Sequence, residues 1–94
     1  MITVGEPHLI PASQLSKPED TVAVTELSGI HLYAVETAKV PGLAEALSRE
    51  ASPYAVVVIH PNADTLQVYP ATDEEDALES IYDIEYRIAD IIFG

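Results

Sequence analysis

The 94-residue sequence contains no cysteine, and it has only four Lys and Arg residues against sixteen Asp and Glu. The lack of cysteine excludes disulfides, thiol catalysis and cysteine-ligated zinc or iron–sulfur centres. The net charge of −12 at pH 7 argues against direct binding to DNA, RNA or an anionic membrane, because those partners need a basic surface. The same charge favours a basic partner, and it also favours simple solubility.

Long hydrophobic runs are missing as well. The longest apolar run is YAVVVI at residues 54–59, which is far too short to span a membrane. Residues 1–11 have neither the basic region nor the apolar segment of a signal peptide, so we expect a cytoplasmic location. Apolar residues still make up 48% of the chain, which is typical of a globular protein, and the length predicts a single domain over residues 1–94.

The first half of the chain predicts an arm, a hairpin and a short helix. Residues 1–20 contain three prolines and little periodicity, so we expect an extended, partly irregular arm in which residues 2–4 pair as a short strand at most. Two β-rich runs, 22–27 and 30–36, flank a Ser-Gly pair and indicate a hairpin. Residues 41–51 then carry a modest apolar stripe after a proline and predict a helix.

The second half predicts two more strands and a long helix. Residues 54–60 are apolar on both faces, which is typical of a central strand covered on both sides, and residues 65–69 alternate as a half-buried partner strand. Residues 72–93 predict the last helix. The resulting order is ββαββα. We therefore expect an α+β fold with a four-stranded, mostly antiparallel sheet, packed by a short helix and by a long, acidic C-terminal helix.

Catalytic and metal-binding patterns are not found. The three histidines show no metal-ligand spacing, and the glycines are too scattered for a phosphate-binding loop. The serines that we considered as nucleophiles, Ser28, Ser48 and Ser80, lack the neighbours that nucleophilic catalysis needs. The sequence therefore predicts no metal site and no cofactor, and it does not indicate an enzyme.

Seven carboxylates against one base, Arg87, fall within residues 72–87. The first four, at residues 73–76, have a structural reason, since the helix dipole favours negative charge in the first turn. Thr72 and Glu75 fit a capping box there. Further along, four carboxylates share one helical face and form like-charge neighbours. This acidic face consists of Asp76, Glu79, Asp83 and Asp90.

Two apolar seams run along the same helix. The first is expected to pack on the sheet and consists of Ala77, Ile81, Ile84, Ile88 and Ile91. The second consists of Leu78, Tyr82, Ala89 and Phe93. Glu85 projects between the two seams. Either the second seam faces another molecule, a second copy or a target, or it is the periphery of the core and Glu85 reaches solvent at its margin.

Two functional hypotheses follow from this helix. The first is a small acidic binding or inhibitor protein that occupies a basic surface of a protein target, such as a nucleic-acid-binding protein, by mimicking a nucleic-acid backbone. Antitoxin, immunity and anti-defence proteins have this charge and size. In this hypothesis the acidic face and Glu85 contact the partner, and Tyr82 and Tyr86 anchor it. The alternative is a homodimeric structural or assembly protein that associates through the second seam, with its acidity serving solubility or salt adaptation.

Overall fold

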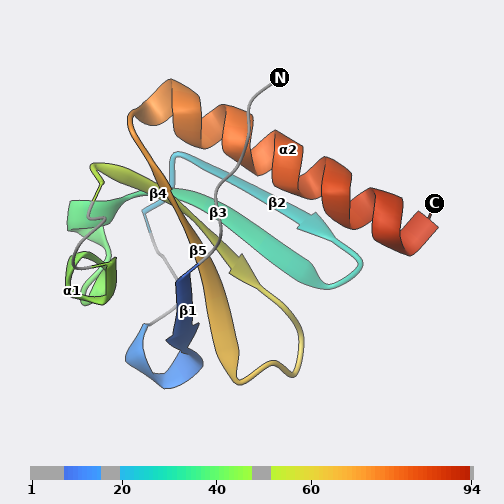
Figure 1. Ribbon diagram of the computed structural model, residues 1–94, viewed down its shortest axis with the longest axis horizontal. Helices are drawn as coiled ribbons and strands as arrows, with labels where there is room; N and C mark the ends of the chain where they lie inside the picture. Colours follow the sequence, from blue (N-terminus) through green and yellow to red (C-terminus); the bar gives the residue numbers. More distant parts are fainter. Residues whose placement is uncertain (1–7, 16–19, 48–51, 94) are drawn as a thin grey trace.

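The computed structural model describes residues 8–15, 20–47 and 52–93 (Figure 1). Five antiparallel strands form one sheet in the order β1-β5-β4-β3-β2. The strands are β1 (His8–Pro11), β2 (Ala23–Leu27), β3 (Ile30–Glu36), β4 (Tyr54–Ile59) and β5 (Thr65–Ala71). The helices are the 3-10 turns η1 (Ala12–Gln14) and η2 (Thr37–Lys39), the short α1 (Leu43–Leu47) and the long α2 (Glu74–Phe93).

The α+β fold with an antiparallel sheet and a C-terminal helix is confirmed, but the prediction of four strands is wrong. The fifth strand is β1, which lies in the arm expected to be irregular and pairs with β5 in the register Ile10↔Leu66. It is only four residues long and ends in Pro11, so its alternation is too short to stand out in the sequence. The strand expected at residues 2–4 lies outside the described residues.

The hairpin between β2 and β3 forms as predicted. Its two turn residues, Ser28 and Gly29, have φ angles of 52° and 84°, which are the left-handed values of a two-residue hairpin turn. The helix predicted at 41–51 begins only at Leu43, because Gly42 has a φ of 83° and so is not helical. Residues 48–51 of that prediction lie outside the described part of the chain.

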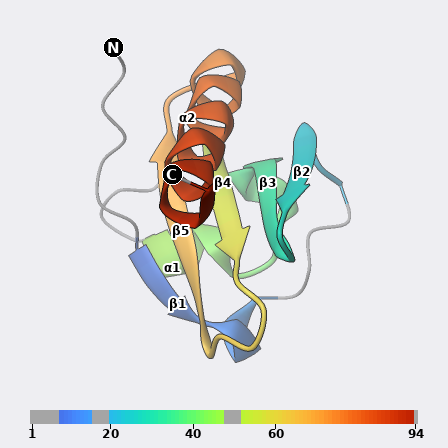
Figure 2. The same ribbon diagram turned by 90° about the vertical axis from the view of Figure 1, so that its right-hand side faces the viewer.

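The core has two layers, one on each face of the sheet. Alternate residues of β3 and β4, including Leu32, Val56 and Val58, pack with α2 on one face. Their neighbours along the chain, such as Val35 and Val57, pack with α1 on the other. Figure 2 shows α2 almost end-on above the sheet, with its C-terminus towards the viewer. The prediction that β4 is buried on both sides is confirmed, since residues 55–58 are all buried.

Helix α2 is longer than the sheet on which it packs. Ala77, Ile81 and Ile84 are buried against the strands, and Ile88 is half-buried. Ile91 was expected to continue this face into the core, but it is 83% exposed. The expectation fails because the last turn of α2 projects beyond the ends of the strands, as Figure 1 shows at the C-terminus. Among the described residues, no helix is long and apolar enough to cross a membrane.

Truncation of two isoleucines on this face should separate the packed part of α2 from the projecting part. Ile81→Ala should lower the free energy of unfolding by about 2–5 kcal/mol, because it leaves a cavity in a fully packed site. Ile91→Ala should change it by less than about 0.5 kcal/mol, because that side chain is in solvent. Urea denaturation followed by circular dichroism measures both. Equal losses for the two variants would show that the last turn packs on the domain.

Candidate interaction face on helix α2

The start of α2 uses its own carboxylates. Asp73 Oδ1 accepts a hydrogen bond from the backbone N–H of Asp76 at 2.7 Å, so Asp73 is the N-cap. In return, Asp76 Oδ2 accepts from the backbone N–H and the hydroxyl of Thr72, at 2.9 and 3.3 Å. In place of the capping box predicted for Thr72 and Glu75, Asp73 takes the N-cap position and Asp76 bonds back to Thr72, the residue before the cap. Asp76 belongs to this helix start.

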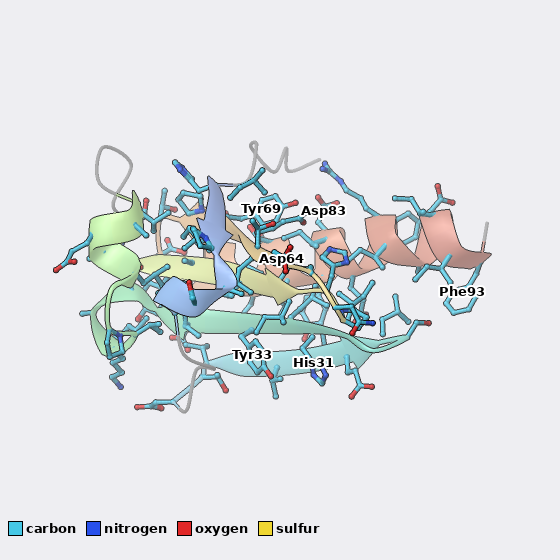
Figure 3. The ribbon with its side chains drawn as sticks, turned by 90° about the horizontal axis from the view of Figure 1, so that it is seen from below. His31, Tyr33, Asp64, Tyr69, Asp83 and Phe93 are labelled. Carbon is cyan, nitrogen blue, oxygen red and sulfur yellow. The ribbon has the colours of Figure 1, made fainter. Side chains whose placement is uncertain are left out.

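Asp83 is held within the protein by an ion pair. Its carboxylate is half-buried, and Oδ2 lies 3.3 Å from the Arg87 guanidinium one turn later. Oδ2 is shielded from solvent and makes no hydrogen bond of good geometry, so its contact with Arg87 is electrostatic. Arg87 is thereby used inside α2, as the spacing of four residues suggests. Figure 3 labels Asp83 in the middle of the helix.

Glu85 faces the domain's own sheet. Its Oε2 atom accepts a hydrogen bond of 2.5 Å from the hydroxyl of Thr25, which lies on β2, sixty residues earlier. A hydrogen bond to a charged acceptor is shorter and stronger than one between neutral groups. Glu85 therefore ties the middle of α2 to the edge strand. The sequence contained no signal for Thr25, because the contact depends on how the helix lies over the strands.

Glu79 and Asp90 differ from the other carboxylates of the acidic face. Both are exposed, as is Glu75, and none of the three has an ion pair or hydrogen-bond partner among the described residues. Both Lys and Arg side chains within the described ranges already have partners: Arg87 pairs with Asp83, and Lys39 pairs with Glu36 and Asp20. The structure thus separates the predicted acidic face into two internally used and two solvent-facing carboxylates.

Lys39 lies in a polar hollow beside the first turn of α2. Its ammonium is 3.1 Å from Glu36 and 3.3 Å from Asp20. Hydrogen bonding to Glu36, and then to Asp20, raises the pKa of Lys39 above its usual value. Tyr54 and Glu74 complete the lining of this hollow together with Thr21 and Val22. Lys39 therefore neutralises carboxylates of its own chain. Across the described residues, no group of three His, Asp or Glu side chains could hold a metal ion.

Three aromatic side chains project from the outer side of α2. Tyr82 is 65% exposed, Tyr86 is 74% exposed and Phe93 is 71% exposed. With the half-buried Ala89 they form a straight stripe along the helix, which we call the outer seam: Tyr82, Tyr86, Ala89 and Phe93. Figure 3 shows Phe93 at the free end of α2, beyond the strands. Leu78, which the sequence placed in the second seam, is half-buried.

A shallow hollow interrupts the outer seam. It is lined by Tyr86, Ala89, Asp90 and Phe93. The small side chain of Ala89 leaves space between the two larger rings, and Asp90 supplies a carboxylate at the rim. The outer seam therefore combines exposed rings, a recess and a solvent-facing negative charge on one rigid helix.

The bond between Thr25 and Glu85 should be measurable by a double-mutant cycle. We expect Thr25→Val and Glu85→Met each to destabilise the protein, with a coupling energy of roughly 1 kcal/mol, because each variant removes one partner of the same part-buried hydrogen bond. Urea unfolding of the wild type, the two single variants and the double variant gives this energy. A coupling energy of zero would show that Glu85 does not tie α2 to β2.

No protein-family model, curated protein or solved structure matches this chain at a significant level. The residues of α2 and their surroundings therefore carry the functional proposal.

Proposed function

We propose that this protein is a small acidic binding protein of the inhibitor type, which places the outer seam of α2 on a basic surface of a protein target. One observation carries the proposal. Tyr82, Tyr86 and Phe93 are each about two-thirds exposed or more, on a helix whose neighbouring carboxylates Glu79 and Asp90 have no cation partner in the described residues. Exposed aromatic rings beside unpaired charge are typical of an interaction surface.

The rings and the carboxylates have different physical roles in this proposal. Burial of an aromatic side chain contributes on the order of 1.5–3 kcal/mol, so Tyr82, Tyr86 and Phe93 supply the affinity. Glu79 and Asp90 attract a basic surface from a distance and speed the encounter. Up to Ile88 the helix costs little to order on binding, because its inner face is already packed on the sheet there.

Mimicry of a nucleic-acid backbone is one form of this proposal. Carboxylates three and four residues apart on a helix lie about 5–6 Å apart at Cβ and make a row of anions. Asp76 belongs to the helix start and Asp83 pairs with Arg87, so Glu79 and Asp90 are the solvent-facing members of this row. Exposed aromatic rings lie beside them. We therefore favour a target groove that is basic at its rim and apolar at its centre. Antitoxin, immunity and anti-defence roles against nucleic-acid enzymes are the settings that suit such a protein.

Charge reversal on α2 tests the proposal. In extract of the native host, the wild-type protein should retain a partner that elutes as the salt concentration rises, and the variant Glu79→Lys/Asp90→Lys should lose it. With the purified partner, the variant should show an association rate lower by roughly tenfold or more at low ionic strength. Biolayer interferometry at several salt concentrations measures this rate.

The matched control moves the same charge to another place. Glu45→Lys/Asp64→Lys replaces two exposed carboxylates away from α2 and gives the same net charge as the test variant. It should bind the partner with nearly the wild-type association rate. If both double variants bind as badly as each other, total charge governs the interaction. If both bind as well as the wild type, these charges do not contribute to binding. Either result shows that the proposed face is wrong. Both double variants should fold. In the test variant, Glu79→Lys relieves like-charge repulsion and a lysine at residue 90 suits the helix dipole. In the control, the two replaced side chains are exposed.

A homo-oligomer is the second candidate, and the projecting end of α2 favours it. The last turn exposes Ile91, Ile92 and Phe93, which are three consecutive apolar side chains at the free end of the helix. Under the main proposal, light scattering after size exclusion should give the monomer mass of 10.2 kDa. A stable dimer that Ile91→Asp or Leu78→Asp abolishes would support the second candidate and count against a free binding face.

A further inference from the structure

We propose that the partner presents an amphipathic helix with one basic flank, and that this helix packs lengthwise along the outer seam of α2. This inference rests on the proposed function and narrows the target's basic surface to one kind of structure. The members of the outer seam follow one another at intervals of four, three and four residues. Two helices that pack side by side at a shallow angle contact each other through residues with this spacing. The seam is twelve residues long, or roughly 18 Å at 1.5 Å per residue.

The hollow on the seam has the form that such packing requires. Its lining residues, Tyr86, Ala89, Asp90 and Phe93, stand at positions i, i+3, i+4 and i+7 of the helix. In packing of the coiled-coil type, one side chain of the partner helix inserts into a hole made by four residues of the facing helix. The recess above Ala89 therefore accepts one apolar side chain, with the rings of Tyr86 and Phe93 on either side of it.

Charge along the seam indicates the flank of the partner. Glu79 and Asp90, which are exposed and have no partner among the described residues, lie on the same side of the outer seam. Asp83, which is paired with Arg87, lies beside them on that side. Asp90 also lines the hollow, which places an unpaired carboxylate next to the inserted side chain. The opposite side of the seam carries Glu85, which is tied to Thr25. A partner helix with Lys or Arg along the flank that meets Glu79 and Asp90 is complementary to this arrangement.

The same charges disfavour a second copy of this chain as the occupant. In an antiparallel pair, the flank with Glu79 and Asp90 would face its own equivalent, and like charges would meet. In a parallel pair, that flank would face the side that carries Glu85. Either arrangement adds repulsion to the −12 charge on each copy. The partner is therefore a different, basic chain.

Designed peptides test the inference without knowledge of the natural target. The probe is a helical peptide of three heptads with Leu at the first and fourth positions and Lys along one flank of that apolar stripe. Its control has the same composition in an order that abolishes the apolar stripe. Isothermal titration calorimetry with the wild-type protein should give at least tenfold tighter binding of the probe. Added salt should lower the affinity of the protein for both peptides. The difference in affinity between probe and control should persist, because it comes from apolar burial.

Two exposed-surface variants locate the binding site of the probe. The double variant Tyr86→Ser/Phe93→Ser should bind the probe at least tenfold more weakly than the wild type. The control Leu9→Ser/Val24→Ser also removes two exposed apolar side chains, and it should bind the probe with the wild-type affinity. Changes in backbone amide NMR signals should concentrate along residues 79–93.

Each result has a distinct meaning. Equal binding of probe and control, or binding of neither, overturns the helix inference, and so does a dimer formed through the outer seam. If probe and control bind equally, or if neither binds, the proposed function would still be supported by loss of the host partner on charge reversal at Glu79 and Asp90. Loss of the probe in the Leu9 and Val24 variant would place the site on the sheet and overturn the inference as well.

Discussion

The contact between the inner face of α2 and the central strands determines the rest of this structure. Ala77, Ile81 and Ile84 are buried against β3, β4 and β5, and they fix the rotation of the helix about its axis. Since successive residues of a helix are separated by about 100°, this rotation decides the direction of every other side chain. Tyr82 and Tyr86 point to solvent because the isoleucines point to the sheet. The acidic and aromatic outer side is thus a consequence of apolar packing on the inner side.

The negative charge is distributed so that it disturbs this packing little. Some carboxylates of α2 act locally: Asp73 and Asp76 form the helix start, and Asp83 pairs with Arg87. Others remain in water, where solvent and salt screen their repulsion. Beside the first turn of α2, Lys39 neutralises Glu36 and Asp20. The two Lys and Arg side chains in the described ranges therefore serve the fold, and neither is left to pair with Glu79 or Asp90.

The geometry of α2 connects these features with binding. The helix is rigid where Glu85 and the isoleucines attach it to the sheet, and it projects where Ile91 and Phe93 extend beyond the strands. A rigid, preorganised surface loses little entropy when it binds. Apolar rings next to unpaired carboxylates suit a partner that has both apolar and basic side chains. The recess at Ala89 gives that partner a place for one side chain.

The sequence by itself determined the local elements, because periodicity, turn residues and caps act over a few neighbouring positions. It specified the hairpin at Ser28 and Gly29, the fully buried strand β4 and the long helix with its apolar inner stripe. It also named the four members of the outer seam as interaction residues, although it grouped Tyr82, Ala89 and Phe93 with Leu78 and gave Tyr86 separately as an anchor. Only the tertiary structure decided which elements meet. The pairing of β1 with β5, the bond from Thr25 to Glu85 and the exposure of Ile91 depend on where one element ends relative to another, and residue spacing within a segment carries no information about that distance.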